Sequence, residues 1–262
     1  MQKVALIGIG RWGKVLQGEL SKLAELKYAC DSKADLNQVW DDPEVESVFI
    51  AIPTATHFEI AEKALESGKH VFLEKPGTTS SADLEKLVNL AEAKKLKLAV
   101  GYEFPHHPAV QKIKKLGTPD FIRLEYQKWG TFKDSIITNL LCHDISILKY
   151  LGIPMEALSV NSVSVVTEAD ILATRFGTRA MSIINRASPV KSRTALVKIG
   201  SKNYVWNGVE LFEIVGEEMQ KIDLPDTTPV AEEIKDFLNS PNPLSNGRFA
   251  LEVYKVIESV QA

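Results

Sequence analysis

The first residues with a pattern suited to chemistry lie in the segment Gly8-Ile9-Gly10-Arg11-Trp12-Gly13. Three glycines at this spacing, between an apolar run and a helix-like segment, are typical of a dinucleotide-binding loop. The first glycine permits a tight turn, the second lets a pyrophosphate approach the backbone, and the third lets helix and strand pack closely. We therefore expect the three glycines together with Arg11 and Trp12 to contact a cofactor at a helix N-terminus. The alternative is a glycine turn that binds nothing.

An acidic residue follows this loop at the distance that dinucleotide-binding domains use. Asp31 ends the next predicted strand, about twenty residues after Gly8, where a carboxylate can bond the ribose hydroxyls of adenosine. Such a carboxylate would repel the additional phosphate of NADP, so Asp31 favours NAD. Ser32 and Lys33 follow directly and could bind that phosphate if Asp31 turned away. The predicted cofactor is therefore NAD or NADP, with NAD favoured.

Two longer segments resemble a known family. Residues 48–57 (VFIAIPTATH) and 64–76 (ALESGKHVFLEKP) are similar to the third and fourth strands of the Rossmann domain in the Gfo/Idh/MocA family, the glucose–fructose oxidoreductase and inositol dehydrogenase family. The resemblance covers nearly all of residues 1–118 and continues more loosely towards the C-terminal end. It implies a Rossmann domain followed by a second domain of mixed α and β structure.

By that resemblance Lys75, within Glu74-Lys75-Pro76, is the catalytic lysine, and Glu74 and Lys75 also contact the cofactor. The position of Lys75, directly after the fourth predicted strand, supports this role, because doubly wound sheets bind ligands at the carboxyl ends of their strands. An ammonium group there can polarise a carbonyl or hydroxyl oxygen and pass a proton. The alternative is a solvated loop lysine before a turn proline. The Lys75–Pro76 bond is also a candidate for the cis form.

The resemblance further places Pro53, Thr54 and His57 along the cofactor, after the third predicted strand. For His57 the alternative is a surface position at the start of a helix. His106 and His107 either face the substrate or lie on a surface loop. Because no set of ligands at metal-binding spacing accompanies them, no metal is expected.

His143 is the second catalytic candidate. In the family, a helix at the start of the second domain presents an acid and, four residues later, a histidine that exchanges the hydroxyl proton of the substrate. His143 matches that histidine, but Asn139 stands at the position of the acid. An amide can hold a hydroxyl in place but cannot accept a proton. The neighbouring Asp144 falls on another helical face. The alternative for His143 is a polar residue on a helix that only packs between domains.

Alternating strands and helices in the first half must position these residues. Apolar runs and amphipathic periodicity alternate there, which predicts a parallel, doubly wound α/β sheet. The predicted strands are 3–8, 27–31, 47–52, 70–74 and 96–101. The predicted helices are 12–26, 57–67 and 81–95.

The second half changes to β-prone runs joined by short turns, which predict a mostly antiparallel open sheet. The predicted strands are 121–130, 158–166, 170–176, 179–187, 194–199, 204–206 and 209–215. The predicted flanking helices are 139–150, 230–238 and 248–260. We therefore predict a Rossmann domain over residues 1–118 and an α+β substrate and oligomerisation domain over residues 119–262.

Composition limits the partners. The chain has 262 residues, of which 45% are hydrophobic and 25% charged, as in a protein with two globular domains. Its net charge is −3 and neither half is strongly basic, so no nucleic acid is expected. Its apolar runs are too short for a membrane span or a signal peptide. Cys30 and Cys142 suggest reduced thiols, so we expect a cytoplasmic protein.

These features together predict an NAD(P)-dependent dehydrogenase or reductase acting on CH–OH groups. It would transfer hydride between the nicotinamide and a secondary alcohol or ketone of a sugar, a cyclitol or a related small polyol. The alternatives are an NAD-dependent glycosidase and a non-catalytic NAD(H)-binding regulatory protein, in which Asn139 would mark a decayed site. An uncovered face of the open sheet predicts a homodimer or tetramer.

Overall fold

The chain forms two compact units in the computed structural model, which describes residues 1–261 with the side chain of residue 261 omitted. Unit 1 comprises Met1–Glu103 together with Thr228–Tyr254. Unit 2 comprises Phe104–Thr227 and the end of the chain from Lys255. The predicted domain ranges, 1–118 and 119–262, stay a prediction.

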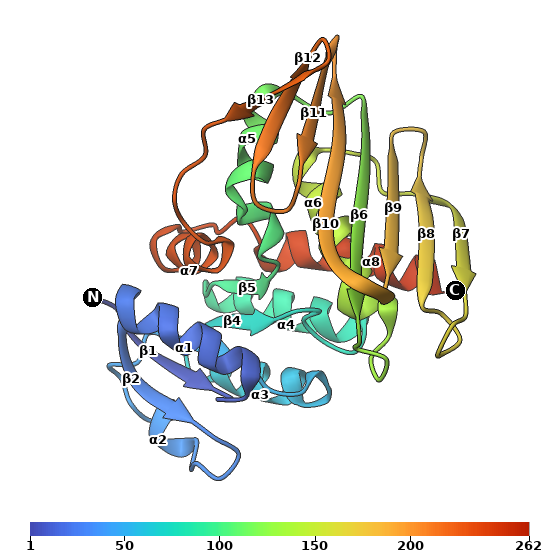
Figure 1. Ribbon diagram of the computed structural model, residues 1–262. Helices are drawn as coiled ribbons and strands as arrows, with labels where there is room; N and C mark the ends of the chain where they lie inside the picture. Colours follow the sequence, from blue (N-terminus) through green and yellow to red (C-terminus); the bar gives the residue numbers. More distant parts are fainter. Residues whose placement is uncertain (262) are drawn as a thin grey trace. The chain divides into compact units, whose positions relative to one another are not determined.

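Unit 1 is built on a five-stranded parallel sheet with the strand order β2-β1-β3-β4-β5 (Figure 1). The strands are β1 (Lys3–Ile7), β2 (Glu25–Cys30), β3 (Ser47–Ile50), β4 (His70–Glu74) and β5 (Leu98–Gly101). Strands β1, β3 and β4 are almost wholly buried, as continuous apolar runs require. The predicted Rossmann sheet is confirmed. Its order reverses between β1 and β3, where such sheets leave a ligand crevice.

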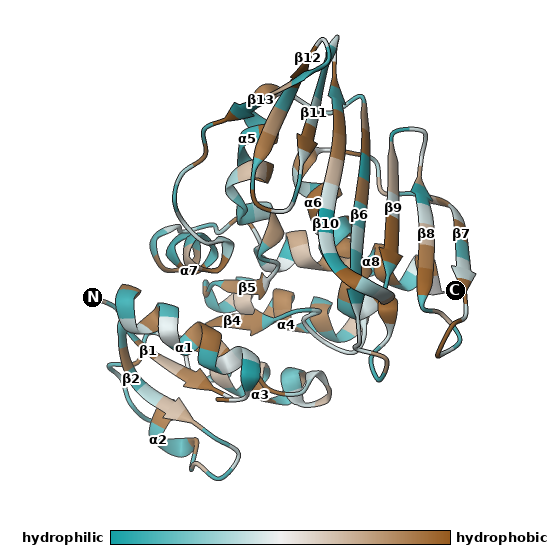
Figure 2. Ribbon diagram, in the orientation of Figure 1, coloured by the Kyte–Doolittle hydropathy of each residue, from teal (hydrophilic) through white to brown (hydrophobic). Residues whose placement is uncertain are grey.

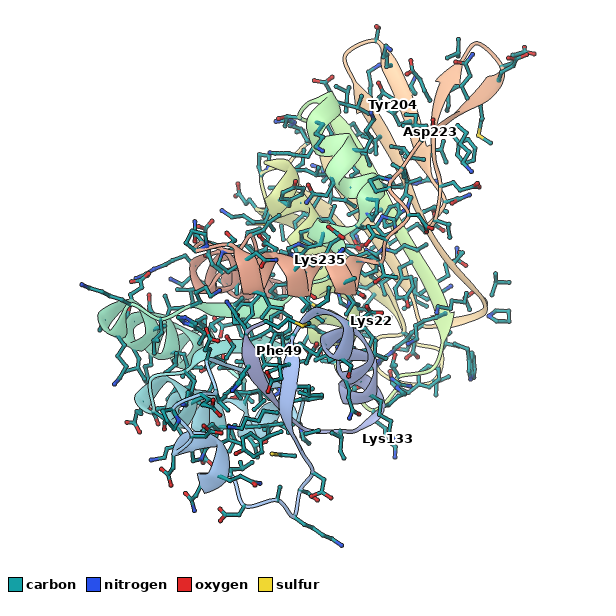
Figure 3. All side chains as sticks on the ribbon, turned by 90° about the vertical axis from the view of Figure 1, so that its left-hand side faces the viewer. Lys22, Phe49, Lys133, Tyr204, Asp223 and Lys235 are labelled. Atoms are coloured by element: carbon teal, nitrogen blue, oxygen red, sulfur yellow. The ribbon has the colours of Figure 1, made fainter. Side chains whose placement is uncertain are left out.

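Helices cover both faces of this sheet. They are α1 (Arg11–Leu23), the short α2 (Asn37–Trp40), α3 (His57–Glu66), α4 (Ser81–Lys94) and α7 (Pro229–Asn239). Phe49 and Phe72 from the sheet and Phe237 from α7 meet in the core, with ring centroids 5.0–5.5 Å apart. Figure 3 labels Phe49 below α7, the helix that carries Lys235.

Helix α7 corrects one expectation. It was predicted to flank the second sheet, but its apolar face, Val230, Ile234, Phe237 and Leu238, packs on the first sheet. The physical reason is that α1 alone leaves part of this sheet face uncovered. A helix from the last quarter of the chain completes the hydrophobic core.

Unit 2 contains an eight-stranded sheet with the order β13-β12-β11-β10-β6-β9-β8-β7. Only β6 and β9 pair in parallel, so the predicted mostly antiparallel sheet is confirmed. Its strands are β6 (Phe121–Trp129), β7 (Ala157–Val163), β8 (Ile171–Phe176), β9 (Ala180–Asn185), β10 (Ala187–Ile199), β11 (Lys202–Trp206), β12 (Leu211–Val215) and β13 (Glu218–Ile222). Strand β13 was not predicted, because its exposed sequence lacks an apolar face.

The remaining helices differ from the predictions in two places. Helix α5 (Pro108–Leu116) was not predicted, although Pro108 at its start and Gly117 at its end are helix boundary signals. The predicted single helix 139–150 is wrong at its start, because a π-helix, η3 (Ile137–Leu141), precedes α6 (Cys142–Leu151). The last helix is α8 (Gly247–Gln261).

Two further findings concern expectations from composition. Among the residues described, no helix combines the length and apolar character needed to cross a membrane. Cys30 and Cys142 are both buried and carry free thiols, as expected. The cytoplasmic location stays a prediction.

Candidate active site

A cavity of about 560 Å³ opens at the carboxyl ends of β1, β2 and β3, a size typical of small-molecule sites. Five residues of the predicted cofactor site line it together: Gly8, Gly10, Asp31, Ser32 and Pro53. Sequence reasoning missed part of the wall, which consists of Ala34, Leu36, Thr56 and Ile60. These residues follow β2 or surround the start of α3, and no sequence motif marks them.

The glycines of the loop differ in what requires them. Gly8 has a φ of +96°, and a Cβ there would lie 2.3 Å from the carbonyl oxygen of Ala51. A Cβ on Gly13 would lie 1.9 Å from the carbonyl oxygen of Gly8. Chain packing therefore excludes side chains at both positions. At Gly10 no heavy atom lies within 4 Å of the equivalent point, so the absent side chain leaves open space beside the cavity.

Helix α1 begins next to that open space. Gly10 is its N-cap residue and makes no side-chain cap bond, and the first turn contains no acidic residue. The amides at a helix N-terminus carry partial positive charge and need acceptors. This end of α1 therefore suits an anionic group such as a pyrophosphate.

Asp31 is one of the residues that line the cavity. Its Oδ1 accepts a hydrogen bond of 2.8 Å from the backbone amide of Lys33, which fixes the side chain in a local turn. A carboxylate in the residue lining of this cavity suits ribose hydroxyls.

The segment after β4 holds Lys75 in a constrained backbone. Lys75 is half-buried, and the Lys75–Pro76 peptide is cis, the isomer considered from the sequence. The Tyr102 hydroxyl donates to the carbonyl oxygen of Pro76 over 3.3 Å, and the Gly77 amide donates to the carbonyl oxygen of Glu74 over 3.1 Å. Lys75 therefore does not lie on an unrestrained loop.

His57 also holds this segment. Its Nδ1 lies 2.7 Å from the carbonyl oxygen of Gly77, and its Nε2 lies 2.8 Å from the carbonyl oxygen of Ile52. The ring is 1% exposed, so the surface alternative is wrong, and burial lowers its pKa. Both nitrogens face the backbone of the protein. His57 thus ties the cavity wall at Ile52 to the segment after Lys75, and its contact with a cofactor stays a prediction.

Glu74 and Trp12 contact each other. The indole Nε1 of Trp12, in the first turn of α1, donates to the Glu74 carboxylate at the end of β4. Burial raises the pKa of Glu74 to about 8, against the opposing effects of Trp12 and Lys75. The pKa of Glu233, on α7, is also well above its usual value, through burial and the negative charges of Glu74 and Glu103.

The remaining predicted cofactor residues lie outside the wall of this cavity. Arg11 is exposed, Gly13 is buried behind Gly8, and Thr54 lies in the 3₁₀ turn η1 (Thr54–Thr56). Their contacts with a cofactor stay predictions.

In unit 2, His143 lies at the start of α6 beside an aromatic cluster. The edge of its ring meets Phe104, with centroids 5.1 Å apart. The Arg193 guanidinium lies 3.9 Å from the Phe104 centroid and pairs with the buried carboxylate of Asp144. Asp144 also accepts a 2.6 Å hydrogen bond from Ser182, so it anchors α6 to the sheet. Sequence reasoning missed Phe104 and Arg193, which are distant in the chain and carry no motif.

Neither His106 nor His107 lies on a surface loop, because both are buried. The ring of His107 is tilted against that of Trp206, with centroids 4.7 Å apart, and its Nδ1 accepts from the Ala109 amide at the start of α5. Burial lowers the pKa of His107 to about 4. Within residues 1–261 no group of three or more histidine, cysteine or acidic side chains is placed to hold a metal ion.

Asn139 lies in the π-helix, and its Nδ2 donates to the Asp134 carboxylate over 3.0 Å. The expectation that Asn139 and His143 share a helical face assumed α-helical spacing, which the π turn interrupts. Their catalytic roles stay predictions.

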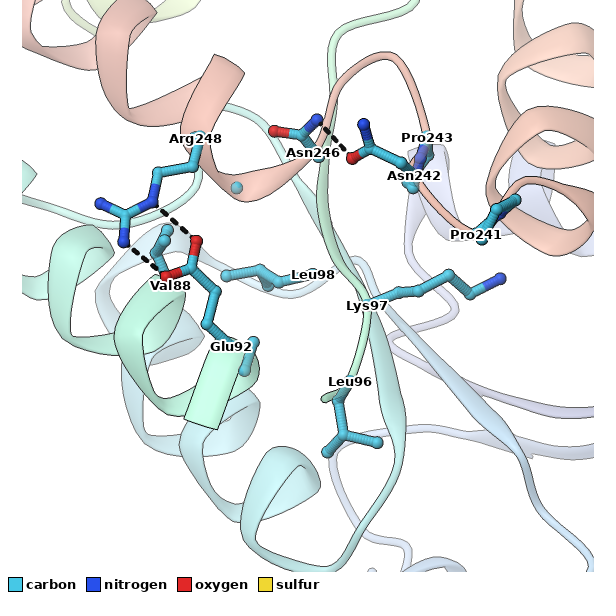
Figure 4. Close-up of a pocket in the computed structure, with 12 residues that line it drawn as sticks. Val88, Glu92, Leu96, Lys97, Leu98, Pro241, Asn242, Pro243, Asn246 and Arg248 are labelled. Carbon is cyan, nitrogen blue, oxygen red and sulfur yellow. Dashed lines mark hydrogen bonds and ion pairs between the residues drawn. The ribbon is translucent and has the colours of Figure 1, made fainter. Parts of the chain in front are cut away.

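A second cavity, of about 350 Å³, lies between α4, the start of β5 and residues 241–248 (Figure 4). Arg248, one of its lining residues, donates from Nε and Nη2 to the two carboxylate oxygens of Glu92. None of the predicted site residues lines this cavity, so it is separate from the candidate site.

Comparison with known proteins identifies a matching family model and several relatives. Residues 14–102 match the family model described as "Oxidoreductase family, NAD-binding Rossmann fold" (GFO_IDH_MocA). The UDP-N-acetylglucosamine 3-dehydrogenase of Acidithiobacillus ferrooxidans is 28% identical over 75% of this chain and 70% of its own length. A dTDP-3,4-didehydro-2,6-dideoxy-α-D-glucose 3-reductase of Saccharopolyspora spinosa is 37% identical, but over only 31% of this chain and 24% of its own.

Solved structures share the fold. A structure of the A. ferrooxidans UDP-N-acetylglucosamine 3-dehydrogenase has a TM-score of 0.89 at 23% identity, over 99% of this chain and 96% of its own. A dehydrogenase (MviM) from Clostridium difficile has a TM-score of 0.88 at 17% identity, over 99% and 98%. The predicted fold class is confirmed.

Proposed function

We propose that this chain is an oxidoreductase of the Gfo/Idh/MocA family and transfers hydride between NAD(P) and a secondary alcohol or ketone of a sugar or related polyol. The family model that residues 14–102 match is that of an NAD-binding Rossmann fold. The observation that carries the proposal is the cavity at the ends of β1, β2 and β3, with the glycine loop and Asp31 in its wall. Lys75 follows the end of β4 in the same sheet.

The cavity residues fit a dinucleotide. The open space at Gly10 and the N-terminal amides of α1 would receive the pyrophosphate. The Asp31 carboxylate would accept hydrogen bonds from the adenosine ribose. A phosphate on that ribose would meet the same carboxylate, so NAD is the proposed preference.

The protein's own groups would then handle the proton and the substrate oxygen. Bound in this site, the dinucleotide would supply the acceptor or donor of hydride. Lys75 would stabilise negative charge on the substrate oxygen with its ammonium group. His143 would exchange the hydroxyl proton, and Asn139 would hold a hydroxyl by hydrogen bonding.

The names of the relatives narrow the proposed substrate. Both are named for reactions at position 3 of a sugar that is linked to a nucleoside diphosphate. We therefore propose a nucleotide-linked sugar that reacts at position 3, within the broader class of sugars, cyclitols and polyols.

The test is turnover followed by the absorbance of the reduced nicotinamide. UDP-N-acetylglucosamine, dTDP-glucose, free N-acetylglucosamine and myo-inositol would each be supplied with NAD and with NADP. We expect turnover with a nucleotide-linked sugar, and Lys75→Ala should lower kcat by about 10²- to 10⁴-fold. Lys75→Ala should still be stabilised by NAD in a thermal shift assay.

The matched control is Lys86→Ala, which removes a lysine of α4 that pairs with Asp83 on the protein surface. Its kcat should equal that of the wild type. Thermal stabilisation by NAD without turnover of any of the four substrates would instead favour an NAD(H)-binding protein without catalysis. Absence of both would contradict the proposal.

We also propose that the protein forms a homodimer or tetramer through the open sheet of unit 2. Along β10, Ala195 and Val197 point into the core, whereas Leu196 points outward and is 39% exposed. Hydrophobic residues recur along β8, β9 and β10 (Figure 2). An extended sheet face with exposed apolar side chains is typical of an interface between subunits.

A further inference from the structure

The loop of residues 130–135, which leads from β6 into the π-helix, is held from inside the fold by Arg186. This arginine is 4% exposed. Its guanidinium donates to the carbonyl oxygens of Thr131, over 3.0 Å, and Asp134, over 2.6 Å. It also pairs with the buried carboxylate of Asp170 over 3.1 Å. A planar guanidinium with these partners fixes their relative positions, so the backbone of Asp134 is held although its side chain is exposed.

The held loop brings the Asp134 carboxylate to Asn139, at 3.0 Å from Nδ2. A carboxylate only accepts hydrogen bonds, so the NH₂ end of the amide must face Asp134. The carbonyl oxygen of Asn139 is then the end directed away from Asp134, and it is an acceptor. Asn139 lies in a π-helix, and π turns occur frequently at functional sites.

We propose that Asp134 is the acidic positioning residue of the substrate site. The inference rests on the proposed function, in which Asn139 bonds a substrate hydroxyl. An amide carries no charge, but a carboxylate bonded to its NH₂ end polarises it and strengthens the bond that its oxygen accepts. Asp134 thereby supplies the negative charge that Asn139 lacks. The Asp134 carboxylate and the Asn139 carbonyl oxygen are both hydrogen-bond acceptors, which suits the neutral hydroxyl groups of a sugar.

A reciprocal exchange of the two side chains tests this. Asp134→Asn removes the charge and should lower kcat/KM by about tenfold, since hydrogen bonds to charged groups are the stronger ones. Asn139→Asp places two carboxylates side by side, and their repulsion should lower kcat/KM by a similar factor. The double variant places an amide on the loop against a carboxylate on the helix. Its kcat/KM should return to within about threefold of the wild type.

The control is Lys133→Ala, because Lys133 neighbours Asp134 and is exposed (Figure 3). Its kinetics should equal those of the wild type. The affinity for NAD should be unchanged in every variant, and melting temperatures are measured to separate kinetic effects from unfolding. If Asp134→Asn does not fold, the comparison of Asn139→Asp with the double variant still tests the inference. The double variant should then have a higher kcat/KM than Asn139→Asp, because only a compensating pair recovers activity.

Unchanged kcat/KM in Asp134→Asn overturns the inference, and so does a double variant whose loss is the product of the two single losses. Either result, obtained with a wild type that turns over one of the four substrates, leaves the proposed function standing. A wild type that turns over none of them overturns the proposed function, and the inference with it.

Discussion

At the scale of single residues, the three glycines of the loop separate packing from binding. Gly13 is required because its Cβ would overlap the carbonyl oxygen of Gly8, at 1.9 Å. Gly10 meets nothing within 4 Å, and its backbone conformation, with φ −68°, is open to other residues. A motif written as three equal glycines therefore contains two different physical requirements.

Alanine at each position should separate the two requirements. Gly13→Ala should destabilise the fold by about 1–3 kcal/mol or more, because the overlap is with backbone. Gly10→Ala should keep its melting temperature but lose at least about tenfold in NAD affinity, because the methyl group fills space proposed for the pyrophosphate. Urea unfolding and isothermal titration measure the two effects. NAD affinity unchanged in Gly10→Ala would contradict this placement of the cofactor.

At the scale of elements, the Trp12–Glu74 bond joins the first turn of α1 to the end of β4. The negative charge of Glu74 in turn raises the pKa of Glu233 on α7. The pKa of Glu74 rises from an ordinary 4.5 to about 8 through burial. Between these values the folded protein keeps a proton that the unfolded chain releases. Stability should therefore fall as the pH rises from about 5 to about 8.

Glu74→Gln tests this dependence, since its amide oxygen can still accept from Trp12. The variant should be more stable than the wild type at pH 8.5, by about 2–4 kcal/mol, and less dependent on pH. Glu233 titrates in the same direction and will retain part of the slope. Melting temperatures at several pH values measure the effect, with exposed Glu59→Gln on α3 as the control. Parallel curves for Glu74→Gln and the wild type would show that Glu74 ionises normally.

At the scale of the whole molecule, the open sheet of unit 2 carries the proposed subunit interface. Leu196→Lys adds a charge to its outward face and should lower the molar mass towards that of a monomer, because a charge at an interface core must be desolvated. Light scattering at micromolar concentration measures the mass. Val209→Lys is the control, because Val209 is 76% exposed in the turn before β12, outside the strands. A monomeric wild type would rule out this interface.

The local pattern of residues along the sequence was sufficient to predict much of this fold. Period and apolar content predicted the five parallel strands and most of the antiparallel sheet, because strands buried on both faces must be continuous apolar runs. The glycine loop and Asp31 could be identified from spacing, because one strand–turn–helix unit contains the loop and Asp31 directly follows the next strand. The segment around Lys75 was recognised through a resemblance, which then also indicated His143 and Asn139.

Contacts between distant residues were decided only by the tertiary structure. His57 is predicted to contact the cofactor, and the structure adds that its two ring nitrogens lie 2.7 and 2.8 Å from the carbonyl oxygens of Gly77 and Ile52. Helix α7 begins at Pro229 yet joins a sheet whose last strand ends at Gly101, since that sheet face needed covering. Arg186, distant in the chain, bonds the carbonyl oxygen of Asp134, whose carboxylate accepts from Asn139 in the π-helix. Periodicity describes one element at a time, whereas these positions depend on side chains that other elements supply.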